Sequence, residues 1–503
     1  MRSKLCSKGK PFVLNHELVD RSNHDRCRRK RAIMLKVYGL RRTMSCLAIM
    51  LATLTLSACQ RREDPSQGPV NSSPVTTVQE KQFVRPPAAT QTAPQVNSET
   101  SAPAAVTLLK EPITSLLMEE QAEALPVWRN FAAQKPTLLL FSGRVLQPLP
   151  GDLGVEVDHL LQQGDDQELV RRMARPVSDQ LLSPGLGVAA AMAQGYFSRV
   201  IWVIPVGKGM EILSLDDFRK GLRQQAPGWS RDIYSFEKTV NGAYSGMLGG
   251  VSVDVVAIDR LPIVKEPLLV HIDAGFFYGI YLDELKTPLY PLLTDHFKKV
   301  ADRGYQALGV TIARANLSFD VPLRMRFLGD DIAAIIASPE LLDEPTKAMQ
   351  LRGEMDYRES FFQPKAIIEK AQALQKIAAR DADSFYRLYR AQLQMNQPGQ
   401  GLSALGQAVS LDPLYALEYF ELVNQKVRHG EQDAALVLLD KSIQALPEHA
   451  LIGVRKAQLL VEMERGEEAV PLLRELEALP WSEYYYPDMH QEIEALLRKA
   501  GKD

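Results

Sequence analysis

Residues 267–277 read Pro-Leu-Leu-Val-His-Ile-Asp-Ala-Gly-Phe-Phe, an apolar run followed by a His and an Asp two positions apart. A continuous apolar run with β-branched residues predicts a strand that is buried on both faces of a parallel sheet. His271 and Asp273 alternate with Ile272 and Ala274, so both side chains should lie on one face near the end of this strand. Ligand sites in such sheets form beyond the carboxyl ends of the strands, so we expect any chemistry of this chain here.

Other apolar runs predict neighbouring strands, with helices between them; the strands are expected at 137–141, 199–206, 251–258 and 307–313. This alternation indicates a three-layer α/β domain with a mostly parallel sheet, which we place at 108–345.

Arg144 and Asn316 follow two of the strands. Together with His271 and Asp273 they could line a cleft for an anionic or sugar-like ligand. A hydrogen-bonded structural role for His271, a capping role for Asp273 and a surface position for Arg144 are the alternatives. We expect Asp254 in a turn or in solvent.

Residues 34–58 have the parts of an export signal: two arginines at 41–42, an apolar core at 47–56, and small residues before Cys59. The core is too short to span a bilayer as a permanent helix. The sequence Leu-Ser-Ala-Cys resembles the bacterial lipoprotein signal, which implies that Cys59 carries lipid such as palmitate. Gln60 stands where Asp would retain such a protein in the inner membrane, so the resemblance implies the outer membrane, facing the periplasm or the surface. The alternatives are an uncleaved anchor or a chance cysteine.

An export signal normally stands at the start of a chain. We therefore interpret residues 1–33, which precede it, as an upstream extension, with Met34 or Met44 as the true start. Cleavage at Cys59 leaves one cysteine, which excludes disulfides, a thiol nucleophile and a cysteine-based metal site. The first 58 residues hold 13 Lys or Arg and 3 Asp or Glu, which leaves 46 basic and 58 acidic residues, a net charge of about −12. A nucleic-acid partner is therefore not expected.

The lipidated Cys and a linker rich in Pro, Ser, Thr and Gln make up 59–107, which we predict to be a disordered tether.

Several pieces occur in an order that resembles an uncharacterised family whose domain is similar to the arginase/deacetylase α/β fold; they lie at 123–129, 199–205, 271–277 and 323–330. Metal enzymes of that fold carry Asp-x-His-x-Asp after the first strand and Asp-x-Asp after a later one, and the metal converts bound water into a nucleophile. Here residues 141–145 read Phe-Ser-Gly-Arg-Val, and Gly275 stands where a second acid would follow Asp273. We therefore expect no metal, no cofactor and no catalytic residue.

From about residue 358 to 503 the sequence predicts helices alone, with a repeat. Pro413, Pro447 and Pro480 close three units at a nearly constant spacing of about 34 residues. The pattern resembles the tetratricopeptide repeat (TPR), which implies a concave surface for a protein or peptide. We expect 363–379 to begin the array and 489–499 to cap it. These helices could instead only pack on the α/β domain. The aromatic residues at 481–486 are either a contact patch or the seam under the cap.

Two functions follow. The first is an envelope lipoprotein that acts as a non-catalytic binding or assembly factor through its repeats, beside a degenerate hydrolase-like domain. The alternative is a metal-dependent amide hydrolase or deacetylase acting on envelope sugars or peptides, with Asp273 as metal ligand and His271 as base.

Overall fold

The computed structural model describes residues 105–173, 176–207, 213–283 and 287–501. The predicted upstream extension, signal peptide, lipidated Cys59 and nearly all of the tether lie outside the described residues. Within the described ranges, no helix is both long enough and apolar enough to cross a membrane.

A nine-stranded sheet forms the centre of the α/β region, in the order β1-β9-β8-β3-β4-β7-β6-β5, with β2 also paired to β9. The strands are β1 (Val106–Thr107), β2 (Ser115–Met118), β3 (Thr137–Phe141), β4 (Arg199–Ile204), β5 (Glu237–Lys238), β6 (Tyr244–Leu248), β7 (Val251–Ala257), β8 (Leu268–Asp273) and β9 (Gln306–Ala313). All pairings from β9 through β7 are parallel. The pairings of β1, β5 and β6 are antiparallel. The sheet is thus mostly parallel.

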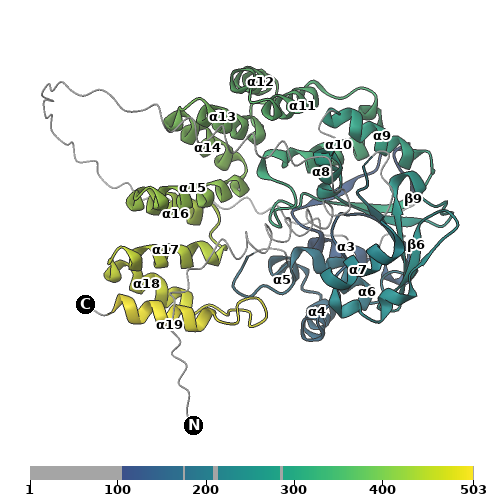
Figure 1. Ribbon diagram of the computed structural model, residues 1–503, viewed down its shortest axis with the longest axis horizontal. Coiled ribbons are helices and arrows are strands. Elements are labelled where there is room, and N and C mark those ends of the chain that lie inside the picture. The colour runs from purple at the N-terminus through teal and green to yellow at the C-terminus, as the bar shows by residue number, and fades with distance from the viewer. Residues whose placement is uncertain (1–104, 174–175, 208–212, 284–286, 502–503) are drawn as a thin grey trace, which may run out of the picture. The chain divides into compact units, whose positions relative to one another are not determined.

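Helices cover both faces of this sheet, because side chains along each central strand alternate between two apolar cores (Figure 1). One core joins Leu139 and Val270 to α8 (Ala274–Asp283), α9 (Leu289–Ala301) and α10 (Phe327–Ala337). The other core joins Leu138 and Leu269 to helices on the opposite face. Those helices are α3 (Leu125–Arg129), α4 (Gly151–Gln163), α5 (Asp166–Arg171), α6 (Gly187–Ala193) and α7 (Leu215–Gln225).

Asp254 does not lie where we expected it. We predicted a turn or solvated position, but this residue lies inside β7 with only 8% of its surface exposed. Arg199 on the adjacent β4 donates from Nε to its carboxylate at 2.6 Å. The parallel register of β4 and β7 brings the two side chains together, which the sequence of either strand alone did not indicate.

Nine helices follow the α/β region among the described residues, and consecutive helices pack in pairs (Figure 1). They are α11 (Lys347–Ser360), α12 (Pro364–Ile377), α13 (Ala382–Gln394), α14 (Pro398–Leu411), α15 (Leu417–Arg428), α16 (Gln432–Ala445), α17 (Ala450–Glu462), α18 (Gly466–Glu477) and α19 (Met489–Ala500). The second helices of the pairs, α12, α14, α16 and α18, begin at equal intervals along the chain. The described chain therefore contains a helical repeat of four pairs and a final helix.

The turns inside the four pairs repeat with the same period. Phe362, Asn396, Gly430 and Glu464 lie at equal intervals and all have a left-handed backbone, with φ between 53° and 75°. This is the usual conformation just after a helix end, and glycine or asparagine adopts it most easily. The repeat begins at α11, one helix earlier than the 363–379 start that we predicted. Phe362 hides this first unit in the sequence, because it stands where a glycine or asparagine would signal the turn.

Both ends of the array are bonded to the α/β region. Near its start, Arg352 of α11 pairs with Asp331 of α10 at 2.6 Å. At the end of its second pair, Arg326 of the α/β region pairs with Asp412 at 2.5 Å and also with Glu119 at 2.6 Å. Near its end, the hydroxyl of Tyr485 accepts from the amide of Ser183 at 2.8 Å and donates to the carbonyl of Leu181 at 3.3 Å. Tyr486 and Ser482 bond to the same segment, through Gln180 and Ser178. Two of the aromatic residues at 481–486 thus bind the α/β region, whereas Trp481 is buried in the array.

Candidate functional site

Buried polar side chains gather at the carboxyl ends of β3, β8 and β9 and in the turn before α3. We call them the polar cluster; its members are Glu120, Gln121, Ser142, Arg144, His271, Asp273 and Thr311. All except Arg144 are at most 3% exposed, and the Arg144 side chain is 14% exposed. The parallel registers of β3, β8 and β9 bring their ends to one edge of the sheet, as expected for a ligand site in this type of fold.

His271 is fully buried in a chain of hydrogen bonds. Its Nε2 lies 3.2 Å from Oδ1 of Asp273, and its Nδ1 lies 2.8 Å from Oγ1 of Thr311. Trp128 donates from Nε1 to the same hydroxyl at 3.3 Å. The Thr311 hydroxyl also donates to the carbonyl of Val270 at 3.3 Å. Both ring nitrogens are therefore engaged within the protein.

Asp273 accepts hydrogen bonds from several directions. Besides His271, Gln121 donates from Nε2 to Oδ2 at 3.1 Å, and the Ser142 side chain also bonds to the carboxylate. Burial alone would raise the pKa of Asp273, but the hydrogen bond from His271 and the charge of Arg144 outweigh it. The net effect holds the pKa of Asp273 below its usual value, so this carboxylate is charged at neutral pH.

The 3₁₀ turn Gln121–Ala124 positions Gln121, and a glycine makes that position possible. A Cβ on Gly187 would approach Cα of Ala122 to 2.6 Å and the backbone oxygen of Gln121 to 2.9 Å. No other residue type leaves room for α6 to begin this close to the turn. The close approach holds Gln121 against the end of β8.

Arg144 forms ion pairs with two carboxylates. Its Nη2 lies 2.6 Å from Glu120, and its Nε lies 2.5 Å from Asp320. Ser318 also accepts from Nη2. Burial alone would lower the pKa of the guanidinium. The nearby carboxylates of Glu120, Asp320 and Asp273 raise this pKa by more than burial lowers it, so Arg144 is charged. The surface position that we considered for Arg144 is therefore wrong.

The pKa of Glu120 is shifted in the opposite direction to that of Asp273. Burial raises its pKa to about 7, although the charge of Arg144 and the amide of Ser318 counteract that effect. The amide lies 2.7 Å from Oε1 of Glu120. The pKa values of two buried carboxyl groups in one cluster are thus shifted in opposite directions, because burial outweighs the favourable contacts at Glu120 but not at Asp273.

Asn316 bonds to groups outside the polar cluster. Its Nδ2 donates to the carbonyl of Val321 at 3.0 Å, and its Oδ1 accepts from Nη1 of Arg326 at 3.0 Å. Arg326 is the residue that links Glu119 to the helical array. The structure therefore brings together Arg144, His271 and Asp273, whereas Asn316 shapes the loop after β9 and orients Arg326.

The polar cluster does not fit a divalent metal ion. Asp273 is surrounded by one imidazole with both nitrogens engaged, by amide and hydroxyl donors, and by a guanidinium, whereas a metal ion needs several free oxygen or nitrogen lone pairs. Among the described residues, no group of three or more His, Cys, Asp or Glu side chains could hold a metal. The side chains around Asp273 therefore leave no set of free ligands for a divalent ion.

Two buried atoms in the polar cluster have no hydrogen-bond partner among the described residues: Nη1 of Arg144 and Oε1 of Gln121. One is a donor and the other an acceptor. A water or a hydroxyl group could satisfy either of them.

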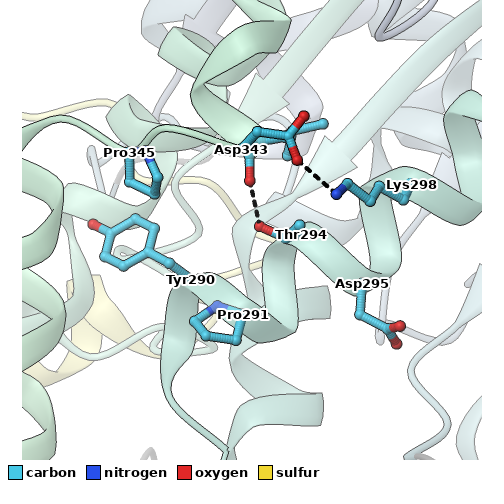
Figure 2. Close-up of a pocket in the computed structure, with 8 residues that line it drawn as sticks. Tyr290, Pro291, Thr294, Asp295, Lys298, Asp343 and Pro345 are labelled. Carbon is cyan, nitrogen blue, oxygen red and sulfur yellow. Dashed lines mark hydrogen bonds and ion pairs between the residues drawn. The ribbon is translucent and has the colours of Figure 1, made fainter.

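A shallow depression of about 500 Å³ lies elsewhere, between α9 and the segment 342–345 (Figure 2). Its polar side chains already have partners. Thr294 donates to the carbonyl of Leu342 at 2.9 Å, and Lys298 pairs with Asp343 at 2.6 Å. We therefore do not consider it the functional site.

Sequence reasoning missed Glu120, Gln121 and Asp320. They lie outside the strands, in short turns whose position depends on packing across the sheet edge. The only sequence signal was their proximity to strand ends, which is too common to single them out.

A scan against models of protein families gives no match, and a search of curated proteins gives none either. Among solved structures, the chain is similar to two described as "Crystal structure of MamA" and "Crystal structure of MamA protein", each with 19% identity and a TM-score of 0.20. The first match covers 36% of this chain and 93% of that chain, and the second covers 37% and 90%. A TM-score of 0.20 is too low to support an argument about fold or function.

Proposed function

We propose that this chain is a lipid-anchored envelope protein that binds a protein or peptide through its helical array and is not an enzyme. The observation that carries the proposal is the four-pair array with its constant period. Stacked helix pairs of this kind form extended surfaces that suit partner binding.

Small residues and prolines favour assigning the array to the TPR class, whose repeat unit has about 34 residues. Gly401, Ala435 and Ala469 occupy the same place in successive second helices, and all are buried. Pro413 and Pro447 each follow the end of one of these helices. A small residue at that place allows the two helices of a pair to approach closely. The side chains on the outer faces then remain available to a partner.

The α/β region supports a non-catalytic role. We propose that it descends from an arginase/deacetylase-like domain that kept the sheet and lost the metal. The ion-paired guanidinium of Arg144 lies at the end of β3, in the polar cluster, where the resemblance would place metal ligands. A fixed positive charge there opposes the binding of a cation.

The lipid anchor is tested on Cys59. We expect the chain to incorporate radiolabelled palmitate and to fractionate with outer membranes, and we expect Cys59→Ser to abolish both. Equal labelling of the two proteins would contradict the anchor without affecting the binding role.

The binding role is tested by photo-crosslinking from two faces of one helix pair. A photoreactive residue replaces either Gln425 on α15 or Val437 on α16, both of which are exposed. A partner that uses one face should give an adduct of constant mass from one position only. Adducts from neither position, or equal adducts from both, would argue against a specific binding surface.

The second candidate function is a hydrolase, and the buried His271–Asp273 pair favours it. Metal analysis of the full chain separates the two functions. Stoichiometric Mn or Zn that is lost in Asp273→Ala would support the enzyme, and a metal-free protein that still forms the crosslink would support the binding factor.

A further inference from the structure

Three aromatic side chains lie exposed at the first turn of the array, where α11 ends. Tyr357, Phe361 and Phe362 are 37%, 53% and 81% exposed, and we call them the aromatic tip. The rings of Tyr357 and Phe361 pack on each other with centroids 4.8 Å apart. Phe362 extends furthest into solvent.

The backbone at Phe362 does not favour a phenylalanine. Its φ is +53°, and the amides of Phe362 and Gln363 donate to the carbonyls of Glu359 and Arg358, in the pattern of a helix that ends in a left-handed residue. Glycine is preferred there, and a bulky side chain costs conformational energy. The equivalent turns carry Asn396, Gly430 and Glu464. Neither backbone preference nor packing among the described residues accounts for Phe362.

The charges around the aromatic tip are mainly positive. Arg358 and Lys365 are exposed on either side of the turn. Two of the nearby acids are already paired: Glu359 with Arg387 and Arg390, and Glu354 with Lys370. Glu369 is exposed one helical turn further along α12. The tip thus combines a small aromatic surface with two flanking cations.

We propose that the aromatic tip inserts into the interfacial region of an anionic lipid bilayer. Aromatic side chains favour the membrane–water interface, and Lys or Arg beside them gain energy from anionic headgroups. A stable protein interface buries about 800 Å² on each partner, more than three side chains at one turn provide. This inference goes beyond the proposed function, and it holds whether or not Cys59 carries lipid.

The first test measures insertion at the turn itself. The full chain carrying Phe362→Trp is mixed with vesicles of phosphatidylcholine containing about 30% brominated phosphatidylglycerol. The control is Glu464→Trp, which places the same side chain at the equivalent turn of the last pair. Fluorescence is compared with that of the unsubstituted protein, because four native tryptophans contribute. We expect bromine quenching of the tryptophan at 362 and none at 464. Equal quenching of both, or quenching of neither in vesicle-bound protein, would overturn the proposal.

The second test measures binding strength in the Cys59→Ser background, so that failure of the lipid anchor cannot be mistaken for failure of the aromatic tip. We expect the double change Phe361→Ser and Phe362→Ser to weaken co-sedimentation with anionic vesicles by roughly tenfold or more. Arg358→Gln with Lys365→Gln should weaken binding to anionic vesicles and leave binding to neutral vesicles unchanged. Unchanged co-sedimentation of both double variants, with thermal unfolding like the parent's, would show that this surface does not bind lipid.

Discussion

At the scale of single residues, the polar cluster depends on Asp273, a buried carboxylate held by His271, Gln121 and Ser142. We expect Asp273→Asn to lower the free energy of unfolding at pH 7 by about 2–4 kcal/mol. The reason is that the N–H group of the new amide would face the hydrogen-bond donors that now bind the carboxylate oxygens. Asp259→Asn, at an exposed ion pair with Lys299, is the control and should change stability by less than about 0.5 kcal/mol.

The loss in Asp273→Asn should depend on pH. The folded-state pKa of Asp273 lies below its ordinary 3.8, so its contribution is complete above that pH and is lost as the pH falls through the folded value. Urea unfolding at pH 7 and near pH 3 should show the difference between the two proteins shrinking in acid. A difference that stays constant would mean that folding does not lower the pKa of Asp273.

Glu120 gives the opposite dependence. Its pKa is raised from 4.5 to about 7, so the folded state binds more protons than the unfolded state between these values, and stability falls as the pH rises through them. We expect Glu120→Gln to remove this part of the slope, changing the pH 5 to pH 8 difference in unfolding free energy by up to about 3 kcal/mol. Parallel pH profiles of the two proteins would contradict the raised pKa.

The sequence predicted the position of His271 and Asp273 at a strand end, because period-two alternation places them on one face. It could not predict their partners. Gln121 and Glu120 reach the cluster only because Gly187 lets α6 begin against their turn, and that contact joins residues far apart in the chain.

At the scale of elements, the left-handed turns of the array predict that two substitutions change the stability of the chain in opposite directions. Glu464 adopts a left-handed backbone at φ 59°, which a non-glycine residue reaches at a cost of about 1–2 kcal/mol. We expect Glu464→Gly to stabilise the chain by about 1 kcal/mol and Gly430→Ala to destabilise it by at least as much. Chemical denaturation measures both, and changes of the same sign would show that backbone strain does not govern these turns.

The buried strands β3, β4, β7, β8 and β9 were predicted close to their observed bounds, because long apolar runs have few alternatives. The short strands β1, β2, β5 and β6 were missed. β6 contains Gly246, where an added Cβ would lie 2.7 Å from the ring of Phe236, and a glycine weakens the strand pattern. Ala379 stands one repeat before Pro413, so no proline marks the end of the first unit, and α11 and α12 were not recognised as a pair.

At the scale of the whole described chain, the array is bonded to the α/β region after its second pair, through Arg326, and near its end, through Tyr485. Both contacts lead toward the polar cluster. Asn316, which orients Arg326, begins the loop that carries Ser318 and Asp320 to Arg144. Ser183 begins the turn that brings Gly185 close to Arg144, where an added Cβ would lie 3.7 Å from its side chain. A change at either of these two contacts can therefore alter the surroundings of the Arg144 guanidinium.

This arrangement predicts a long-range effect of a single hydroxyl. Tyr485→Phe removes the group that accepts from Ser183 and donates to Leu181, a loss of about 1 kcal/mol for each hydrogen bond. We expect amide hydrogen exchange to speed up both at 481–488 and at 178–187, two segments far apart in the sequence, because each segment orders the other. Exchange in α15 and α16 serves as the control and should not change. If only 481–488 responded, the contact would order the end of the array alone, and the α/β region would hold Arg144 without help from the repeats.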